Sequence, residues 1–201
     1  MRTLALLTAL LSLPSSMAMA CHNGVEHAVN PLVSRLRRAE RAMSSGHLRR
    51  AFRTAQRVHR SAREPSDASL RARAERVMAV AAVRLRGDVD LVASRRAPEQ
   101  DRARETIDWA TQTLRRLHAA SQHDVVLAAR LAEALTLDSS TQQEAYDLLM
   151  PLREVLPDTF ALRTMAILLE RFGEEGQSER VLRECMRRTH GAGRGVCRPI
   201  S

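Results

Sequence analysis

The chain has no lysine, very few aromatic residues and, beyond residues 3–13, no long run of apolar residues. A membrane span needs about 20 consecutive apolar residues, so the sequence argues against a polytopic membrane protein. The 201 residues include one Trp, one Tyr and three Phe, which provide no platform on which nucleic-acid bases could stack. The chain is 44% hydrophobic and 27% charged, a composition typical of a globular, helix-prone domain.

Residues 1–20 have the layout of a secretory signal peptide. A single arginine precedes the apolar residues 3–13, and Ala18 and Ala20 are the small residues expected at a cleavage site. We therefore expect an exported bacterial protein with a leader at residues 21–30. It would be located in the periplasm or anchored to a membrane of the cell envelope as a lipoprotein.

Cys21 is the first residue after the expected cleavage site, and two fates are open for it. As the acceptor cysteine of a bacterial lipoprotein it would carry a lipid. After ordinary cleavage it would be free or bonded to another cysteine. The preceding residues are similar to a lipoprotein processing site only in its permissive form, because Ala18 stands where leucine is usual. A membrane would be contacted only through such an anchor or through surface charge.

Two further cysteines, Cys185 and Cys197, lie near the end of the chain. If Cys21 carries a lipid, these two remain to pair with each other. Their disulfide would join a flexible glycine-rich tail, residues 190–201, to the last helix. The alternative is a buried helical thiol at Cys185 and an exposed tail thiol at Cys197.

Arginine supplies all 32 basic residues, and its distribution is uneven. Residues 21–100 hold 17 arginines and 8 acidic residues, a net charge of +9, whereas residues 101–201 hold 14 arginines and 15 acidic residues, a net charge of −1. This asymmetry favours an anionic partner such as an acidic protein, an acidic glycan or phospholipid headgroups. The alternative is a solvated arginine face whose aliphatic stems cover apolar helix surface.

From residue 30 onward the sequence predicts eight helices in four hairpins, with no competing strand pattern. The expected helices cover about residues 31–45, 47–62, 66–86, 98–120 and 124–137, followed by three more that are separated by Pro157 with Asp158 and by Gly173 with Gly176. Ser66 or Asp67 is expected to cap the third helix, and Asp124 the fifth. Pro151 lies inside the sixth, where it removes a backbone hydrogen bond to Asp147, so we expect a kink or a break there.

The second helix of each expected hairpin carries a small residue followed by apolar or small residues four and seven positions later. Such positions share one face of a helix, and a small residue there allows two helices to approach closely. The four sets are Ala51, Ala55 and Val58; Ala103, Ile107 and Ala110; Ala145, Leu149 and Leu152; and Ser178, Leu182 and Cys185.

With this spacing, residues 31–189 resemble the tetratricopeptide repeat (TPR) family, whose 34-residue unit is a helix hairpin. The third unit matches at Ala132, Ala145, Leu149, Leu152 and Pro157, and the first at Ala39, Gly46, Ala51 and Val58. The second unit departs from the pattern through a linker at residues 87–97, and the fourth is degenerate. The resemblance implies an all-α fold of about four antiparallel hairpins stacked as a short right-handed solenoid. The alternative is a helical bundle without a repeat.

No catalytic or metal-binding motif is visible in the sequence. The seven histidines form no HExxH or paired ligand spacing on a helix, and there is no Gly-x-Ser-x-Gly elbow, phosphate loop or dinucleotide fingerprint. We therefore expect a protein that is not an enzyme and has no catalytic residues, cofactor or metal. The alternative is a periplasmic helical-bundle enzyme or ligand-binding protein whose site is not visible in the sequence.

The resemblance implies a scaffold or adaptor that holds a protein or peptide in the groove formed by the first helices of the hairpins. A subgroup of the family clamps carboxylates there with Lys and Asn, but this chain has Leu36 and Glu40 at those positions. Within the basic half we expect an acidic protein partner and no nucleic acid. The candidate partner-binding residues are Arg37, Arg41, Arg49 and Arg53. The alternative is that they form ordinary solvated helix surface.

Overall fold

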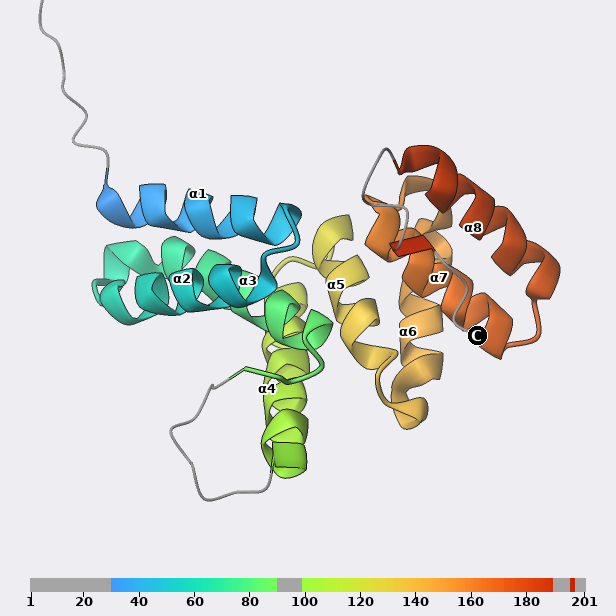
Figure 1. The fold of residues 1–201 in the computed structure, drawn as a ribbon, viewed down its shortest axis with the longest axis horizontal. Helices are drawn as coiled ribbons and strands as arrows, with labels where there is room; N and C mark the ends of the chain where they lie inside the picture. The colour runs from blue at the N-terminus through green and yellow to red at the C-terminus, as the bar shows by residue number, and fades with distance from the viewer. Residues whose placement is uncertain (1–29, 90–98, 190–195, 198–201) are drawn as a thin grey trace, which may run out of the picture. The chain divides into compact units, whose positions relative to one another are not determined.

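A computed structural model describes residues 30–89, 99–189 and 196–197. Within these ranges the chain forms helices and turns, with no strand (Figure 1). The eight α-helices are α1 (Pro31–Ser44), α2 (Leu48–Ser61), α3 (Ala68–Arg84), α4 (Glu99–Ala119), α5 (Val125–Leu135), α6 (Gln142–Leu149), α7 (Thr159–Arg171) and α8 (Glu175–Arg188). Three short 3-10 helices accompany them, η1 (Pro65–Asp67), η2 (Ser139–Thr141) and η3 (Met150–Val155). The predicted all-α class is confirmed.

The chain divides into a segment Met1–Asn30 and a compact unit Pro31–Ser201, and all eight helices belong to the compact unit. The expected signal peptide, Cys21 and the leader up to residue 29 lie outside the described residues. So does the expected tail, apart from Val196 and Cys197. Among the described residues, no helix combines the length and the apolar character that crossing a membrane requires.

Capping residues begin two of the helices. The carboxylate of Asp124 accepts the N–H groups of Val126 and Leu127 at 2.9 and 3.0 Å, as the sequence predicts for α5. Asp158 begins α7 and accepts the N–H of Ala161 at 3.0 Å. The expected cap at the start of α3 does not form, because the chain enters this helix through η1 and Asp67 is not extended there.

Pro151 interrupts the sixth helix. The α-helical pattern stops at Leu149, and the chain continues as the 3-10 helix η3. Proline has no N–H to donate to the carbonyl of Asp147 and its ring is incompatible with the preceding turn. The predicted break is therefore present.

The helices pack in the order in which they occur in the chain. Each helix contacts the next one, and each odd-numbered helix also contacts the next odd-numbered one: α1 with α3, α3 with α5, and α5 with α7. In the described part of the chain, the even-numbered helices have no comparable contact with one another. As a result α3, α5 and α7 have neighbours on several sides.

Burial follows this packing. All residues from Val77 to Val83 in α3 are at most 6% exposed, which requires neighbours around the whole helix. In α2 only one face is buried, with Phe52 on it. Of the small residues expected at close contacts of the second helices, Ala51 and Ala145 are fully buried, Ser178 is nearly so, and Ala103 is half-buried.

Ion pairs join the odd-numbered helices to one another. The pairs are Arg73 with Glu40 at 2.8 Å, Arg84 with Glu133 at 2.8 Å, and Arg130 with Asp158. The first connects α3 to α1, the second α3 to α5, and the third α5 to the capping residue of α7. Each contact between odd-numbered helices thus includes a charged link.

Cys185 and Cys197 form a disulfide, the first of the two alternatives for these cysteines. Their Cα atoms are 5.7 Å apart, and both side chains are buried. The bond joins α8 to a residue 12 positions further along the chain. It therefore fixes part of the expected tail to the helical unit.

Candidate binding site

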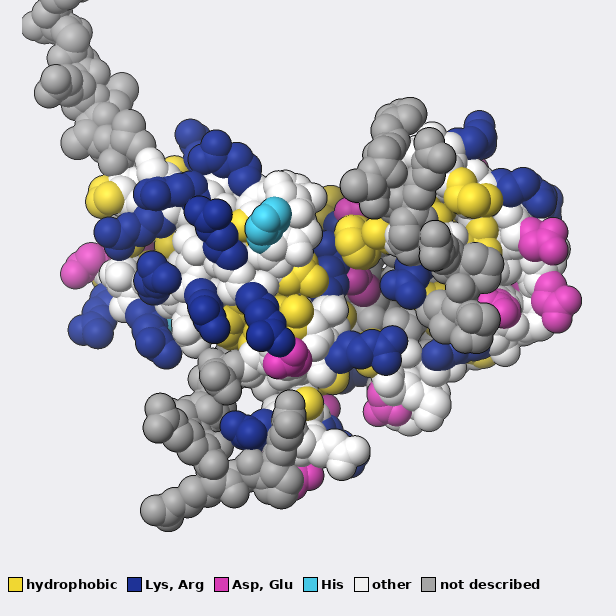
Figure 2. All heavy atoms as spheres, in the orientation of Figure 1, with side chains coloured by type: hydrophobic (Ala, Val, Ile, Leu, Met, Phe, Trp, Pro, Cys, Tyr) yellow, Lys and Arg dark blue, Asp and Glu magenta, His cyan; other side chains and the backbone are white. Residues whose placement is uncertain are grey.

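The first two helices carry an arginine surface that has few acidic neighbours. We call this set the α1–α2 arginines: Arg35, Arg37, Arg38, Arg41, Arg49, Arg50, Arg53, Arg57 and Arg60. All nine are exposed. Figure 2 shows arginine side chains gathered over this part of the molecule on the face that it presents. The only acidic residue of the two helices, Glu40, pairs with Arg73 of α3, so it does not neutralise them.

Among the α1–α2 arginines, only Arg49 makes an ion pair within the described residues, with Asp88. The other eight guanidinium groups have no hydrogen bond or ion pair to the described residues. Elsewhere the pattern is different. Arginines in ion pairs on α3 to α8 are Arg73, Arg76, Arg84, Arg115, Arg116, Arg130, Arg183, Arg187 and Arg188. Unneutralised like charges repel one another and attract anions, so this surface is suited to an acidic partner.

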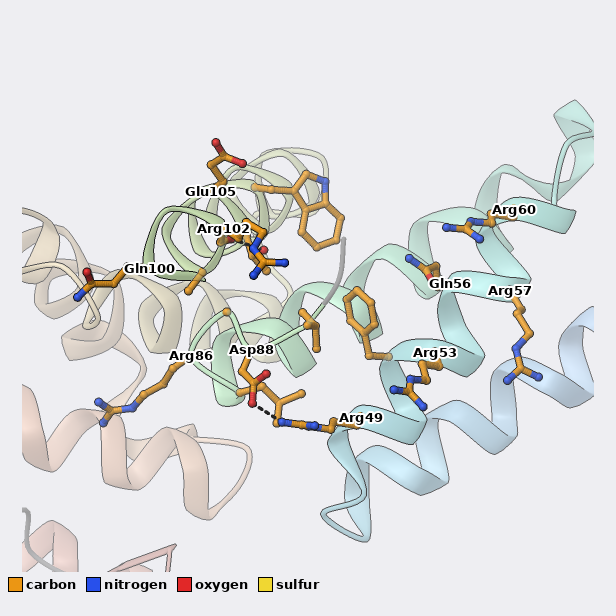
Figure 3. A pocket seen from close by; sticks show the side chains of 17 residues that line it. Arg49, Arg53, Gln56, Arg57, Arg60, Arg86, Asp88, Gln100, Arg102 and Glu105 are labelled. Carbon is orange, nitrogen blue, oxygen red and sulfur yellow. Dashed lines mark hydrogen bonds and ion pairs between the residues drawn. The ribbon is translucent and has the colours of Figure 1, made fainter. Parts of the chain in front are cut away.

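A cleft with a volume of about 1180 Å³ lies between α2 and α4. Its charged lining consists of Arg49, Arg53, Arg57 and Arg60 from α2, Arg86 and Asp88 from the turn after α3, and Arg102 and Glu105 from α4. Figure 3 shows Arg49 and Arg53 on the α2 side, Arg102 on the α4 side, and Asp88 bonded to Arg49. Six arginines and two carboxylates make this basic cleft strongly cationic.

Apolar side chains form part of the wall of the basic cleft. Leu85, Val89 and Trp109 line it and are each half-buried, and Phe52 lies below the surface at 2% exposure. The cleft therefore offers both charge and apolar contact to whatever occupies it.

One buried polar atom stands out at the basic cleft. The Nε atom of Arg102 is buried, and no hydrogen-bond acceptor reaches it among the described residues. A buried donor without an acceptor is costly, and such groups are uncommon in proteins.

Gly87 holds the turn after α3 against α4. Its φ is +79°, and a Cβ atom built on it would lie 2.2 Å from the carbonyl oxygen of Ala103. Only a residue without a Cβ permits this contact. The glycine thus fixes the distance between the turn and α4, which together form one side of the cleft.

Replacing Gly87 with alanine is expected to lower the free energy of unfolding by about 2 kcal/mol, because left-handed strain costs about 1–2 kcal/mol and the overlap with Ala103 adds to it. Urea denaturation measures the loss. Gly46 is a matched control, since its φ is +75° and no atom lies within 4 Å of a built Cβ. Equal losses for Gly46→Ala and Gly87→Ala would show that the turn does not press against α4.

A second, smaller pocket of about 220 Å³ lies along the odd-numbered helices, where the family resemblance implies a binding groove. Of its four arginines, Arg84 and Arg171 have acceptors among the described residues, whereas Arg86 and Arg163 have none. Arg84 pairs with Glu133 and also lies 3.4 Å from the centroid of the Phe160 ring, and Arg171 donates to the carbonyl of Thr136. This pocket has fewer unsatisfied cationic groups than the basic cleft.

The four arginines that the sequence suggests as partner-binding residues fall into two pairs in the structure. Arg49 and Arg53 line the basic cleft, whereas Arg37 and Arg41 are exposed on α1 and do not line it. At the positions of the family's carboxylate clamp, Leu36 is fully buried and Glu40 is bonded to Arg73, so neither faces a ligand as a donor.

Sequence reasoning missed four arginines of the basic cleft, Arg57, Arg60, Arg86 and Arg102. The first two continue the helical spacing of Arg49 and Arg53, and this signal would have found them. Arg86 and Arg102 lie on either side of the linker at residues 87–97. No local pattern shows that the two ends of such a linker meet.

The described residues contain no group of three or more His, Cys, Asp or Glu side chains placed to hold a metal. The shifted titrating groups have structural causes. A hydrogen bond to Glu174, together with burial and nearby carboxylates, raises the pKa of Tyr146. Burial alone would raise the pKa of Glu75, but Arg116 and His59 outweigh burial and lower it. These contacts tie neighbouring helices together.

Comparison of the chain with protein-family models, curated protein sequences and solved structures finds no match.

Proposed function

We propose that the protein is a non-catalytic scaffold or adaptor of the bacterial cell envelope that binds an acidic segment of a partner protein. The observation that carries this proposal is the set of α1–α2 arginines. Nine exposed guanidinium groups lie on two helices, and one of them has an ion pair within the described residues. Four of them line the basic cleft.

We also propose that the helices form a TPR-like right-handed solenoid of about four hairpins. The contacts between successive odd-numbered helices, repeated three times, support this arrangement. So do the ion pairs at each of these contacts and the buried small residues Ala51 and Ala145. A repeated arrangement of hairpins provides a binding surface without a catalytic centre.

An acidic protein segment fits the basic cleft better than a membrane or a nucleic acid does. A flat lipid surface cannot enter a space between two helices. Nucleic-acid bases need exposed aromatic rings, and Trp109 is only partly accessible while Phe52 is buried. Arg53, Arg57 and Arg60 at the rim are exposed, so the cleft is open to solvent rather than closed around a small substrate.

Neutralising the four α2 arginines that line the basic cleft tests the proposal. In the variant with Arg49→Gln, Arg53→Gln, Arg57→Gln and Arg60→Gln, binding of poly-L-glutamate at low salt is expected to weaken by about 30-fold, since exposed ion pairs contribute about 0.2–1 kcal/mol each. The salt dependence should also become flatter because fewer charges take part. Fluorescence anisotropy of labelled poly-L-glutamate measures both.

The matched control removes four arginines from α8, with Arg180→Gln, Arg183→Gln, Arg187→Gln and Arg188→Gln. This variant changes the net charge by the same amount. On α8, however, arginines already pair with carboxylates of the same helix. If the two variants lose affinity equally, binding depends on net charge alone and the arginine surface is not a specific site.

A further inference from the structure

The arginines of α2 form a regular row along the basic cleft. Arg49, Arg53, Arg57 and Arg60 have the spacing i, i+4, i+8 and i+11. This spacing keeps them on one face and spans about 16 Å along the helix, at about 6 Å between neighbours. Carboxylates at i, i+4, i+8 and i+11 of another helix have the same rise. A second helix lying alongside α2 can therefore place one carboxylate opposite each arginine.

The size of the basic cleft suits a helix. A helical segment of about 11 residues, about 16 Å long and 10 Å wide, occupies on the order of 1300 Å³. The cleft of about 1180 Å³ is open to solvent, so it has room for such a segment with its outer face in water.

The wall opposite the arginine row supplies the remaining chemistry. Leu85, Val89 and Trp109 give apolar contact, and Arg102 adds a cationic group beside them. An occupant that matches both walls has carboxylates on one face and apolar side chains on an adjacent face. This is the pattern of an amphipathic helix in a groove.

We infer that the basic cleft binds an acidic amphipathic helix of a partner protein, with its carboxylates along the arginine row of α2 and its apolar face against Trp109. The inference rests on the proposed function and adds the secondary structure and charge pattern of the bound segment.

The helix comes from another molecule. The exposed carboxylates Asp101, Glu105 and Asp108 of α4 stand at helical spacing, but α4 forms a wall of the basic cleft, so this helix cannot also fill the cleft of the same chain. The chain's segments outside the described ranges contain two acidic residues, Glu26 and Asp90. On α8, Glu179 and Glu184 already pair with arginines of the same helix. Neither source provides a row of carboxylates at helical spacing.

Two synthetic peptides without tryptophan test this inference on the full chain. One carries Glu at i, i+4, i+8 and i+11 with Leu on the adjacent face, and the other has the same composition in scrambled order. Trp109 is the only tryptophan of the chain, so its emission reports on the basic cleft. The patterned peptide should bind at least tenfold more tightly than the scrambled one and shift the emission of Trp109 to shorter wavelength.

Variants locate the bound peptide. Arg53→Gln with Arg57→Gln should weaken binding of the patterned peptide about fivefold or more, whereas Arg183→Gln with Arg187→Gln on α8 should leave it unchanged. Equal affinity for the two peptides would overturn the inference that the basic cleft recognises carboxylates at helical spacing.

Two further outcomes separate the inference from the proposed function. The peptide could bind without changing Trp109 emission and depend on Arg37 and Arg38 instead. This result would overturn the basic cleft as the site, but the proposal of an acidic partner would stand. If the protein binds neither peptide, both the inference and the proposed function fail. Binding of the protein to phosphatidylglycerol vesicles would not change that conclusion.

Discussion

Replacing Asp158 with alanine is expected to lower the free energy of unfolding by about 3 kcal/mol. The carboxylate accepts the N–H of Ala161 as the cap of α7, and such a cap contributes about 1 kcal/mol. It also pairs with Arg130, whose side chain is 11% exposed. Removing one partner of a fully buried pair costs about 3–5 kcal/mol. Here the cost is reduced to about 2 kcal/mol, because the Asp158 side chain is 37% exposed and Glu133 stays within 3.3 Å of Arg130. Urea denaturation at pH 7 measures the loss.

Asp124 provides the control for this prediction. It caps α5 in the same way but lies 3.8 Å from Arg76, which is partly exposed. Asp124→Ala should therefore cost about 1 kcal/mol, the value of a cap alone. If Asp158→Ala costs no more than Asp124→Ala, the pair with Arg130 contributes nothing.

The same pair makes stability depend on pH. Burial alone would raise the pKa of Asp158, but the hydrogen bond and charge of Arg130, with the N–H of Ala161, outweigh burial and lower it. The stabilisation is present above the unfolded-state pKa of about 3.9 and is lost as pH falls through the lower folded-state value. Asp158→Asn should accordingly show a smaller loss of stability below pH 4 than the unaltered protein.

Breaking the disulfide is expected to lower the free energy of unfolding by about 3 kcal/mol, because the bond restricts the unfolded chain and closing a loop of this length contributes about that amount. The bond spans 12 positions between Cys185 and Cys197. The variant Cys197→Ala, compared with the unaltered protein under oxidising conditions, measures the effect by urea denaturation.

A reducing agent serves as the control for the disulfide. It should lower the stability of the unaltered protein to that of Cys197→Ala and leave the variant unchanged. If the reducing agent destabilises both equally, or neither, the bond between Cys185 and Cys197 does not stabilise the protein.

The sequence predicts the helices well because their end signals are local. A cap at Asp124 or a break at Pro151 depends only on the residues within one turn, so each appears where expected. The predicted cap at Asp67 does not form. A 3-10 turn before α3 changes the backbone conformation that the cap requires.

The candidate binding site is only partly predictable from the sequence. Arg49 and Arg53 stand out because they lie on one helix in a basic stretch. Arg102 and Trp109 join them only when α4 packs beside the turn at Gly87, a contact between residues on opposite sides of a linker. Neither charge nor helical spacing in the sequence contains that information.

Nuclear magnetic resonance mapping of the bound peptide tests the central claim most directly. When the patterned acidic peptide is titrated into the ¹⁵N-labelled protein, amide and arginine Nε–Hε signals of α2, the turn at residues 85–89 and α4 should shift together and reach saturation. Shifts confined to α8 or to the odd-numbered helices, or no shifts, would contradict the assignment of the basic cleft as the site for an acidic partner.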